Sequence, residues 1–282
     1  MLLLVALVSA ALTADLAPPY YGFERPALDY ELPPLSGYDP QAGDLEPFLD
    51  GETSRVHRSG VHAGYVTGLN AALREWRNTY QSSYKRLDAI PAALLRQPSI
   101  PELCAVSAQL KLSRLSVIEI LRNMSRTPSK YRTALQVNAG GYFNHALYYA
   151  VLSPNPNNEE RRPTAELAAD IQASFRSTLE FQFRFTEAAL GLVGSGWVWL
   201  CRNTTANSRR LLIITTANED TPLPLGLRPL IALDVWEHAY FLKHRERRDK
   251  YVTDWWGVLD WEAVERLDGW WSGLRDSTHD EL

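Results

Sequence analysis

The stretch "ALDVWEHAYF", residues 232–241, places an aspartate, a glutamate and a histidine among large apolar side chains. Charged side chains are rarely fully buried unless they are paired or bind a metal. If the segment runs from a strand into a helix, Asp234 and His238 are four residues apart and share one face. A carboxylate and an imidazole placed in this way can bind one metal ion. For this spacing alone, however, a core histidine beside an acid is the more frequent explanation.

The composition narrows the choice of partners. Of the 282 residues, 45% are hydrophobic and 22% are charged, which is ordinary for a globular protein and leaves enough apolar material for a core. The formal net charge of −4 provides no basic field of the kind that attracts nucleic acid. We therefore expect no nucleic-acid partner.

The two ends of the chain carry targeting signals. Residues 2–12, "LLLVALVSAAL", form an apolar run that is too short to span a bilayer and is followed by small residues. We interpret residues 1–14 as a signal peptide and expect no membrane span. The chain stops at "HDEL", residues 279–282, which matches a retention signal. Together the signals predict a protein of the endoplasmic reticulum lumen that a retention receptor binds through the HDEL terminus.

In that compartment, four further residues could be glycosylated or form a disulfide. Asn123 in "NMS" and Asn203 in "NTT" match the acceptor pattern for N-glycosylation, which takes place in secreted and lumenal proteins. Cys104 and Cys201 are the only cysteines, and an oxidising lumen permits a disulfide between them. The sequence sets no distance between their Cα atoms, so a bridge and two free thiols both stay open.

The first half of the chain is predicted to be helical. Residues 15–26 are rich in Pro and Tyr and form an extended lead, and residues 27–154 form a helical domain. A long helix is expected from about Thr53, and a less regular, proline-interrupted insertion lies near residues 81–112. The residues that the periodicity assigns to the apolar side of this helix are Val56, His57, Val61, Tyr65, Leu69 and Trp76.

The second half adds a small sheet. The turn-rich segment "SPNPNNEERRP" marks a domain boundary, and residues 155–268 form the domain that follows it. Three apolar runs in this domain are typical of strands: "GWVWLCRN", "RRLLIITTAN" and "LRPLIAL". The order of elements predicts an α+β fold, in which a helical N-terminal domain built on a long hairpin precedes helices around a small three-stranded antiparallel sheet. Residues 269–282 are a tail with the HDEL signal.

Six segments of the chain are informative as a set: "YELPPLSGYD", "ETSRVHRSGVHAGYVTGLN", "NAGGYFNHALYYAVLSPN", "GSGWVWL", "TANEDTPL" and "DVWEHAYF". Together they resemble the iron/manganese superoxide dismutase family and occur in the order that the family has. The likeness runs from about Tyr30 to Leu267 and is broken mainly by the insertion. Each segment alone is a weak match, whereas six at workable spacing are specific.

The resemblance implies a metal site and a reaction. The positions that match the family's ligands are His57, His145, Asp234 and His238. They imply one manganese ion per subunit, with iron as the alternative, because neutral imidazoles and one carboxylate suit both metals. The implied reaction is the disproportionation of superoxide to dioxygen and hydrogen peroxide.

The resemblance also implies roles for residues around the metal. Tyr65 matches a tyrosine at the substrate entrance, and Arg248 matches an arginine that attracts the superoxide anion. Glu237 matches an acid that reaches the partner subunit's copy of His238, which implies a homodimer or a tetramer. The tryptophans that match the family's aromatic shell around the metal are Trp197, Trp199 and Trp236.

Three positions depart from the family pattern. Val61 and Phe241 stand where the family usually has a histidine and a tyrosine that meet across the dimer interface. The family also places a glutamine amide beside the metal's open position, from one of two locations. The location used mainly by iron enzymes is Gly141 here, which favours manganese, and the other holds Glu219, unless a one-residue bulge presents Asn218 instead. Among the residues expected to act in catalysis, Glu219 is therefore the one whose chemistry differs.

Two other functions stay open. The changes at Val61, Glu219 and Phe241 are compatible with a non-catalytic, metal-binding or structural member of the same fold. Two histidines and a carboxylate also form the facial triad of non-haem iron oxygenases. The third histidine of the expected ligand set counts against that second alternative.

Overall fold

The computed structural model describes residues 21–35, 37–88, 99–204 and 210–273. The predicted signal peptide, the first part of the lead and the HDEL terminus lie outside these ranges. None of the helices within them combines the length and the hydropathy needed to cross a membrane.

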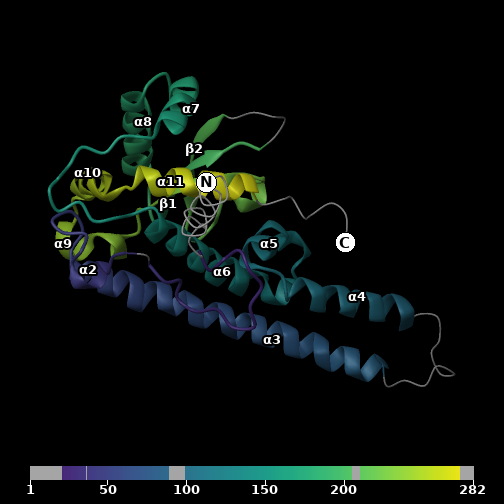
Figure 1. Ribbon diagram of the computed structural model, residues 1–282. Coiled ribbons are helices and arrows are strands. Elements are labelled where there is room, and N and C mark those ends of the chain that lie inside the picture. The colour runs from purple at the N-terminus through teal and green to yellow at the C-terminus, as the bar shows by residue number, and fades with distance from the viewer. Residues whose placement is uncertain (1–20, 36, 89–98, 205–209, 274–282) are drawn as a thin grey trace, which may run out of the picture.

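The N-terminal half is a long helical hairpin (Figure 1). Helix α3 runs along both α6 and α4, and α5 packs on α6. The predicted insertion is largely a lengthening of the two arms of this hairpin, because α3 continues to Asp88 and α4 begins at Ser99. The elements are η1 (Pro40–Ala42), α2 (Gly51–Arg55), η2 (Val56–His62), α3 (Ala63–Asp88), α4 (Ser99–Leu112), α5 (Val117–Arg122), η4 (Met124–Arg126) and α6 (Ser129–Ala150).

The start of the long helix differs from the prediction of one continuous α-helix. Asp50 caps α2 by accepting a hydrogen bond from the backbone N–H of Thr53, and seven residues of π-helix, η2, then precede α3. A π-helix has i→i+5 hydrogen bonds, so it shifts the buried face relative to a 3.6-residue period. Val56, which the periodicity placed on the apolar side, is consequently 44% exposed, and His62 is fully buried instead.

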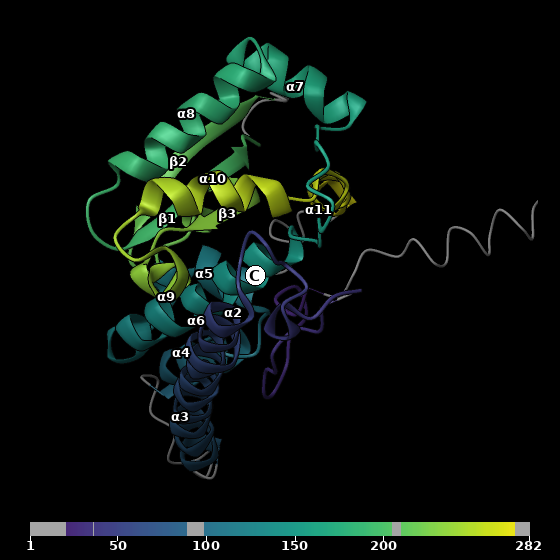
Figure 2. The ribbon, with the colours of Figure 1, turned by 90° about the vertical axis from the view of Figure 1, so that its left-hand side faces the viewer.

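The C-terminal half surrounds a sheet of three antiparallel strands in the order β2-β1-β3. Helices α7 and α8 lie against β1 and β2, and α6 and α11 lie against β3 (Figure 2). The predicted α+β fold is therefore confirmed. The elements are α7 (Ala165–Phe175), α8 (Thr178–Gly191), β1 (Gly196–Arg202), β2 (Leu211–Ala217), η5 (Leu223–Leu225), β3 (Arg228–Asp234), η6 (Glu237–Ala239), α9 (Phe241–His244), α10 (Arg248–Val258) and α11 (Trp261–Gly273).

The central strand explains why the run "GWVWLCR" does not alternate in polarity. All seven residues of β1 are buried, because helices cover the sheet on both faces. Cys201 is one of them, whereas Cys104 is exposed on α4, and both thiols are free. The disulfide that the lumen would permit is therefore not formed between these two residues.

Two glycines of α6 let the halves of the chain approach closely. A Cβ at Gly140 would stand 2.1 Å from the carbonyl oxygen of Glu219, and a Cβ at Gly141 would stand 2.5 Å from the ring of Tyr65. No other residue fits these positions without movement of the backbone or of the tyrosine. The glycines therefore set the distances between α3, α6 and the turn after β2.

The two ends of the described chain are joined by aromatic contacts. The rings of Tyr21 and Phe23 lie 5.3 Å and 5.8 Å from the ring of Trp270 in α11. Trp270 belongs to the last turns of α11, which continues to Gly273, five residues beyond the predicted domain end at 268.

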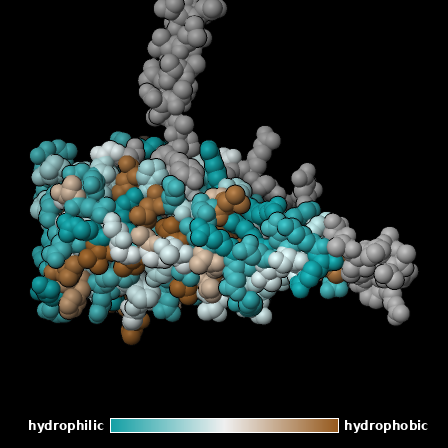
Figure 3. All heavy atoms as spheres, turned by 90° about the horizontal axis from the view of Figure 1, so that it is seen from below, coloured by the Kyte–Doolittle hydropathy of each residue, from teal (hydrophilic) through white to brown (hydrophobic). Residues whose placement is uncertain are grey.

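Seen from below, the distal part of the hairpin is hydrophilic, and apolar side chains gather toward the end where α2 and α9 lie (Figure 3).

Candidate metal centre

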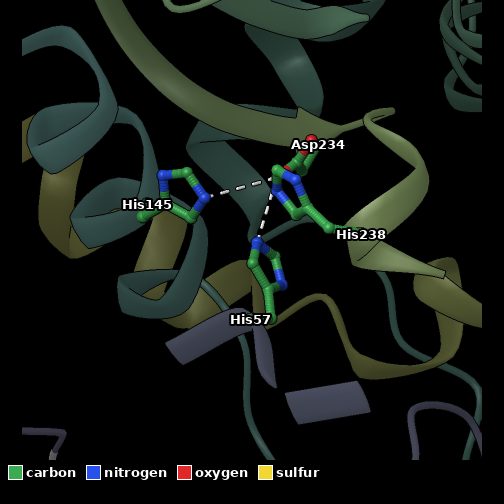
Figure 4. Close-up of side chains that lie close together, drawn as sticks. All are labelled: His57, His145, Asp234 and His238. Atoms are coloured by element: carbon green, nitrogen blue, oxygen red, sulfur yellow. Dashed lines mark hydrogen bonds and ion pairs between the residues drawn. The ribbon is translucent and has the colours of Figure 1, made fainter. Parts of the chain in front are cut away.

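Four side chains from four different elements converge beneath the sheet (Figure 4). His57 comes from η2, His145 from α6, Asp234 from the end of β3 and His238 from η6. One ligand atom of each lies within 4.8 Å of all the others. The Nε2 atoms of His57, His238 and His145 lie 3.0, 3.1 and 3.6 Å from Oδ2 of Asp234. The structure thus brings together all four predicted ligands.

The backbone orients the carboxylate. Asp234 pairs with Trp197 at the end of β3, and its Oδ1 accepts a hydrogen bond of 2.8 Å from the backbone N–H of Trp236. This bond occupies one carboxylate oxygen at the strand-to-turn corner and leaves Oδ2 directed at the histidines. The strand-to-helix geometry expected from "DVWEH" is correct in its essentials, with η6 as the first helical turn.

The arrangement of His145 is what a metal ligand requires. Its Nδ1–H donates to the carbonyl oxygen of Gly141 at 2.7 Å, which leaves the lone pair on Nε2. Nε2 is buried and has no hydrogen-bond partner among the described residues, although it faces the other three ligands. A buried polar atom without a partner is costly, and a cation in the cluster would satisfy it.

The protonation states also fit a cation. Burial lowers the pKa of His57 and of His145, against the opposing attraction of Asp234, so both imidazoles are neutral at physiological pH. Burial alone would raise the pKa of Asp234, but the imidazoles of His238 and His57 outweigh it and the pKa falls. Three imidazole nitrogens and one carboxylate form a donor set suited to manganese or iron.

A second set of polar groups lies beside His145. The ring of Tyr65 is half-buried and lies 5.3 Å from the ring of His145, and its hydroxyl is 2.8 Å from Oε1 of Glu219. Glu219 is 3% exposed, and its Oε2 accepts hydrogen bonds of 3.1 Å from Nδ2 of Asn144 and from Nε1 of Trp197. Glu219 therefore faces the site, and the alternative in which a bulge presents Asn218 is wrong.

Comparison with known proteins agrees with this site. The description "Iron/manganese superoxide dismutases, alpha-hairpin domain" matches residues 29–95, and "Iron/manganese superoxide dismutases, C-terminal domain" matches residues 163–267. A protein of Listeria monocytogenes named "Superoxide dismutase [Mn]" is 36% identical over 86% of this chain and 98% of its own length. The chain belongs to the iron/manganese superoxide dismutase family. A further relative, "Superoxide dismutase [Mn] 3" of Leptolyngbya boryana, is 34% identical over 84% of this chain and 81% of its own.

Aromatic rings enclose the superoxide dismutase-type centre. Trp197 and Trp236, both expected in the shell, lie 4.9 Å from His145 and 5.5 Å from His238. Trp199 is one layer further out, since its ring packs on Trp197 at 5.8 Å and its Nε1 donates to Thr216. These rings exclude water, which lowers the local dielectric around the ligands.

Sequence reasoning missed several residues of the shell. Tyr148 and Tyr149 lie 5.1 Å and 5.5 Å from the ring of His57, and Asn144 binds Glu219. Their signal was the spacing on α6, where they stand one, three and four residues from His145. His62 stacks on His145 at 5.4 Å, and burial lowers its pKa to about 3. The π-helical turn, which a helical period does not reveal, brings it there.

Arg248 lies outside the group formed by the ligands, Tyr65 and Glu219. Its guanidinium donates to the carbonyl oxygens of Leu192 at 2.6 Å and Gly194 at 3.2 Å, and it lies 5.8 Å from the ring centre of Tyr240. These bonds tie the loop after α8 to the start of α10. The role of this arginine in attracting superoxide stays a prediction.

Removal of a ligand should empty the centre. We expect His145→Ala and Asp234→Ala to lower manganese affinity by roughly 100-fold or more, because each ligand is held in place by packing and cannot be replaced by a neighbour. Manganese per subunit, measured by elemental analysis after dialysis, and the loss of metal-dependent thermal stabilisation report this. His244→Ala is the matched control, since His244 also pairs with a carboxylate, Asp254 at 2.8 Å, outside the centre. Full manganese occupancy in Asp234→Ala would refute the ligand assignment.

The buried carboxyl group should make stability depend on pH. Burial and the charge of Asp234 raise the pKa of Glu219 to about 8, against the hydrogen bonds from Tyr65, Asn144 and Trp197. Between its unfolded value near 4.5 and about 8, the folded state holds a proton that the unfolded state releases, so stability falls as pH rises and levels off above pH 8.

We therefore expect metal-free Glu219→Gln to be more stable than wild type above pH 5, by a difference that grows to a few kcal/mol near pH 8. Urea unfolding of chelator-treated protein at several pH values measures the difference. Glu187→Gln, on the exposed side of α8, should keep the wild-type profile. Parallel profiles for wild type and Glu219→Gln would show that Glu219 is not titrated in this window.

Proposed function

We propose that the protein disproportionates superoxide to dioxygen and hydrogen peroxide, with one manganese ion per subunit and iron as the alternative metal. The observation that carries the proposal is the cluster of His57, His145, Asp234 and His238, in which the lone pair of a buried imidazole has no hydrogen-bond partner within the described ranges. Bound there, manganese supplies the two oxidation states by which one superoxide is oxidised and the next is reduced.

The residues of the chain supply access, enclosure and a proton. Tyr65 is only half-buried beside His145, so its hydroxyl is the polar group that a small anion meets on the way to the centre. Trp197 and Tyr148 are fully buried around the ligands and exclude water from the other sides. The oxygen product needs no proton, whereas peroxide needs two, and the hydrogen-bonded pair of Tyr65 and Glu219 lies beside His145.

Two observations support manganese rather than iron. The relatives from Listeria and Leptolyngbya described above are both named as manganese superoxide dismutases. Gly141 leaves no room for the glutamine that occupies this location mainly in iron enzymes, because even a Cβ there would stand 2.5 Å from the ring of Tyr65. The polar group beside the open position therefore comes from Glu219 alone.

A direct assay tests the proposed reaction. Protein loaded with manganese should consume superoxide catalytically, and the iron-loaded protein should do so less well or at a different pH. Loss of this activity in His145→Ala, with retention in His244→Ala, would tie it to the centre. A protein that binds one manganese ion per subunit and leaves superoxide unchanged would support the non-catalytic alternative. Oxygenase chemistry is disfavoured, since three histidines and an aspartate exceed a facial triad.

We also place the protein in the lumen of the endoplasmic reticulum. The support is in the sequence, where an apolar leader begins the chain and "HDEL" ends it. Glycosylation at Asn203, half-buried at the end of β1, and at Asn123, whose Nδ2 donates to the carbonyl oxygen of Glu119, belongs to the same proposal. A variant with extra residues after Leu282 should be secreted, and its appearance in the medium tests the proposed location.

The face around His238 fits a second copy of the chain. Glu237 is exposed there, and Val56 and Phe241 are each 44% exposed on α2–η2 and α9, which pack together with η6. An acid beside exposed apolar side chains is the composition of an interface. Through Glu237 and the partner's copy of His238, the subunits would form a dimer or a pair of dimers. The replacement of a histidine by Val61 and a tyrosine by Phe241 makes this contact apolar on both sides.

A charge in this face should separate the subunits. We expect Phe241→Lys to weaken self-association by roughly ten-fold or more, because an ammonium would be buried against Val61 or its neighbours. Analytical ultracentrifugation over a concentration series measures the change. Leu179→Lys, at an apolar position on α8 that is 78% exposed, should leave association unchanged. A wild type that sediments as a monomer at all concentrations would disprove the dimer.

A further inference from the structure

The side chain of Glu219 is a buried acid without a positively charged partner. It lies in the turn after β2 and is 3% exposed. Among the described residues, no lysine or arginine forms a hydrogen bond or ion pair with it. The groups that bond it are Tyr65 of α3, Asn144 of α6 and Trp197 of β1, and the charge that acts on it is the carboxylate of Asp234. Every neighbour is thus neutral or negative.

The hydrogen bonds determine which oxygen can carry a proton. Oε2 accepts from Nδ2 of Asn144 and from Nε1 of Trp197, both at 3.1 Å. An indole N–H and an amide NH₂ can only donate, so Oε2 has to remain an acceptor. A proton on this carboxyl group therefore belongs on Oε1, whose neighbour is the hydroxyl of Tyr65 at 2.8 Å.

The hydroxyl of Tyr65 has a single proton, so its direction depends on Glu219. If Glu219 is ionised, Oε1 can only accept, and Tyr65 has to give its proton to that bond. If Oε1 carries a proton, it donates to the tyrosine oxygen, and the proton of Tyr65 is free to point elsewhere. The remaining direction is the half-exposed side of the ring, next to His145.

We propose that Glu219 is protonated on Oε1 in the metal-loaded protein and donates a hydrogen bond to Tyr65, so that Tyr65 presents its own proton to the open side of the centre. This inference rests on the proposed function. Glu219 is then a positioning residue that acts through Tyr65. The pair would hold two protons in a row, one on each oxygen, at the place where peroxide has to be protonated.

The surroundings hold the pair at this distance. Gly140 packs on the backbone of Glu219 and Gly141 on the ring of Tyr65, so both partners rest against the same helix. Burial and Asp234 favour the neutral acid and raise the pKa of Glu219 to about 8. A bound cation acts in the opposite direction, but the charge of Asp234 at the same ion offsets part of it. Glutamine in this place would also donate to Tyr65, through its amide.

Infrared spectroscopy of the manganese-loaded protein tests the arrangement. Near neutral pH we expect a protonated-carboxyl band that Glu219→Gln lacks. The C–O stretching band of Tyr65, identified by ring labelling and by its loss in Tyr65→Phe, should have the same frequency in wild type and in Glu219→Gln, because the tyrosine accepts in both. At alkaline pH the acid band should vanish and the Tyr65 band should shift in wild type only.

Two results would overturn the proposal. If wild type has no carboxyl band dependent on Glu219 near neutral pH, the acid is ionised and Tyr65 donates to it. If the band is present but the Tyr65 frequency differs from that of Glu219→Gln, the proton lies on Oε2, with the amide of Asn144 turned to accept it. Neither result involves superoxide. Expected spectra in a protein that does not consume superoxide would overturn the proposed function alone.

Discussion

The meeting of the two halves of the chain at the metal centre depends on one carboxylate oxygen. Oδ2 of Asp234 lies within 3.6 Å of three imidazole nitrogens that come from both halves of the chain. The carboxylate is fully buried, and burial keeps His57 and His145 neutral, so neither of these two imidazoles balances its charge. A buried charge in that position is unfavourable without a counter-ion. A metal ion at this point therefore links η2, α6 and the end of β3, and metal binding is coupled to the packing of the two halves.

The second determinant is the close packing of α6. Gly140 and Gly141 admit the turn after β2 and the ring of Tyr65 to within contact of the helix backbone, one turn before His145. The same helix thereby fixes a ligand, the tyrosine and the carboxyl group of Glu219. Its carbonyl at Gly141 also receives the Nδ1–H of His145, which sets the tautomer. The two glycines of the motif "NAGG" therefore do more than allow close packing. Through this packing they fix the positions of Tyr65 and Glu219 and the tautomer of His145.

The sequence predicted the parts of the site that depend on local geometry. The spacing in "DVWEH" made Asp234 and His238 candidate ligands, but only the family resemblance assigned them. His57 and His145 were assigned through the resemblance alone, because no local pattern links residues so far apart. The π-helical turn was not predicted, and its shift explains the exposure of Val56 and the burial of His62. Arg248 was assigned through the family resemblance, which contains no information on the backbone carbonyls that its guanidinium binds.

Glu219 shows how an apparent loss of function can preserve a hydrogen-bond pattern. Oε2 accepts from Asn144 and Trp197 in the same way that an amide oxygen would, and a protonated Oε1 donates where an amide nitrogen would donate. The acid and the amide therefore make the same bonds to Asn144, Trp197 and Tyr65 as long as the acid keeps its proton, although the amide nitrogen has a second N–H that Oε1 lacks. An acid in place of a glutamine adds a pH limit. Below the pKa of Glu219 the proton of Tyr65 is available to the centre, and above this pKa the carboxylate holds that proton. No lysine or arginine bonds Glu219 in the described chain, so burial and Asp234 raise that limit, whereas the ion and the hydrogen bonds from its neighbours lower it.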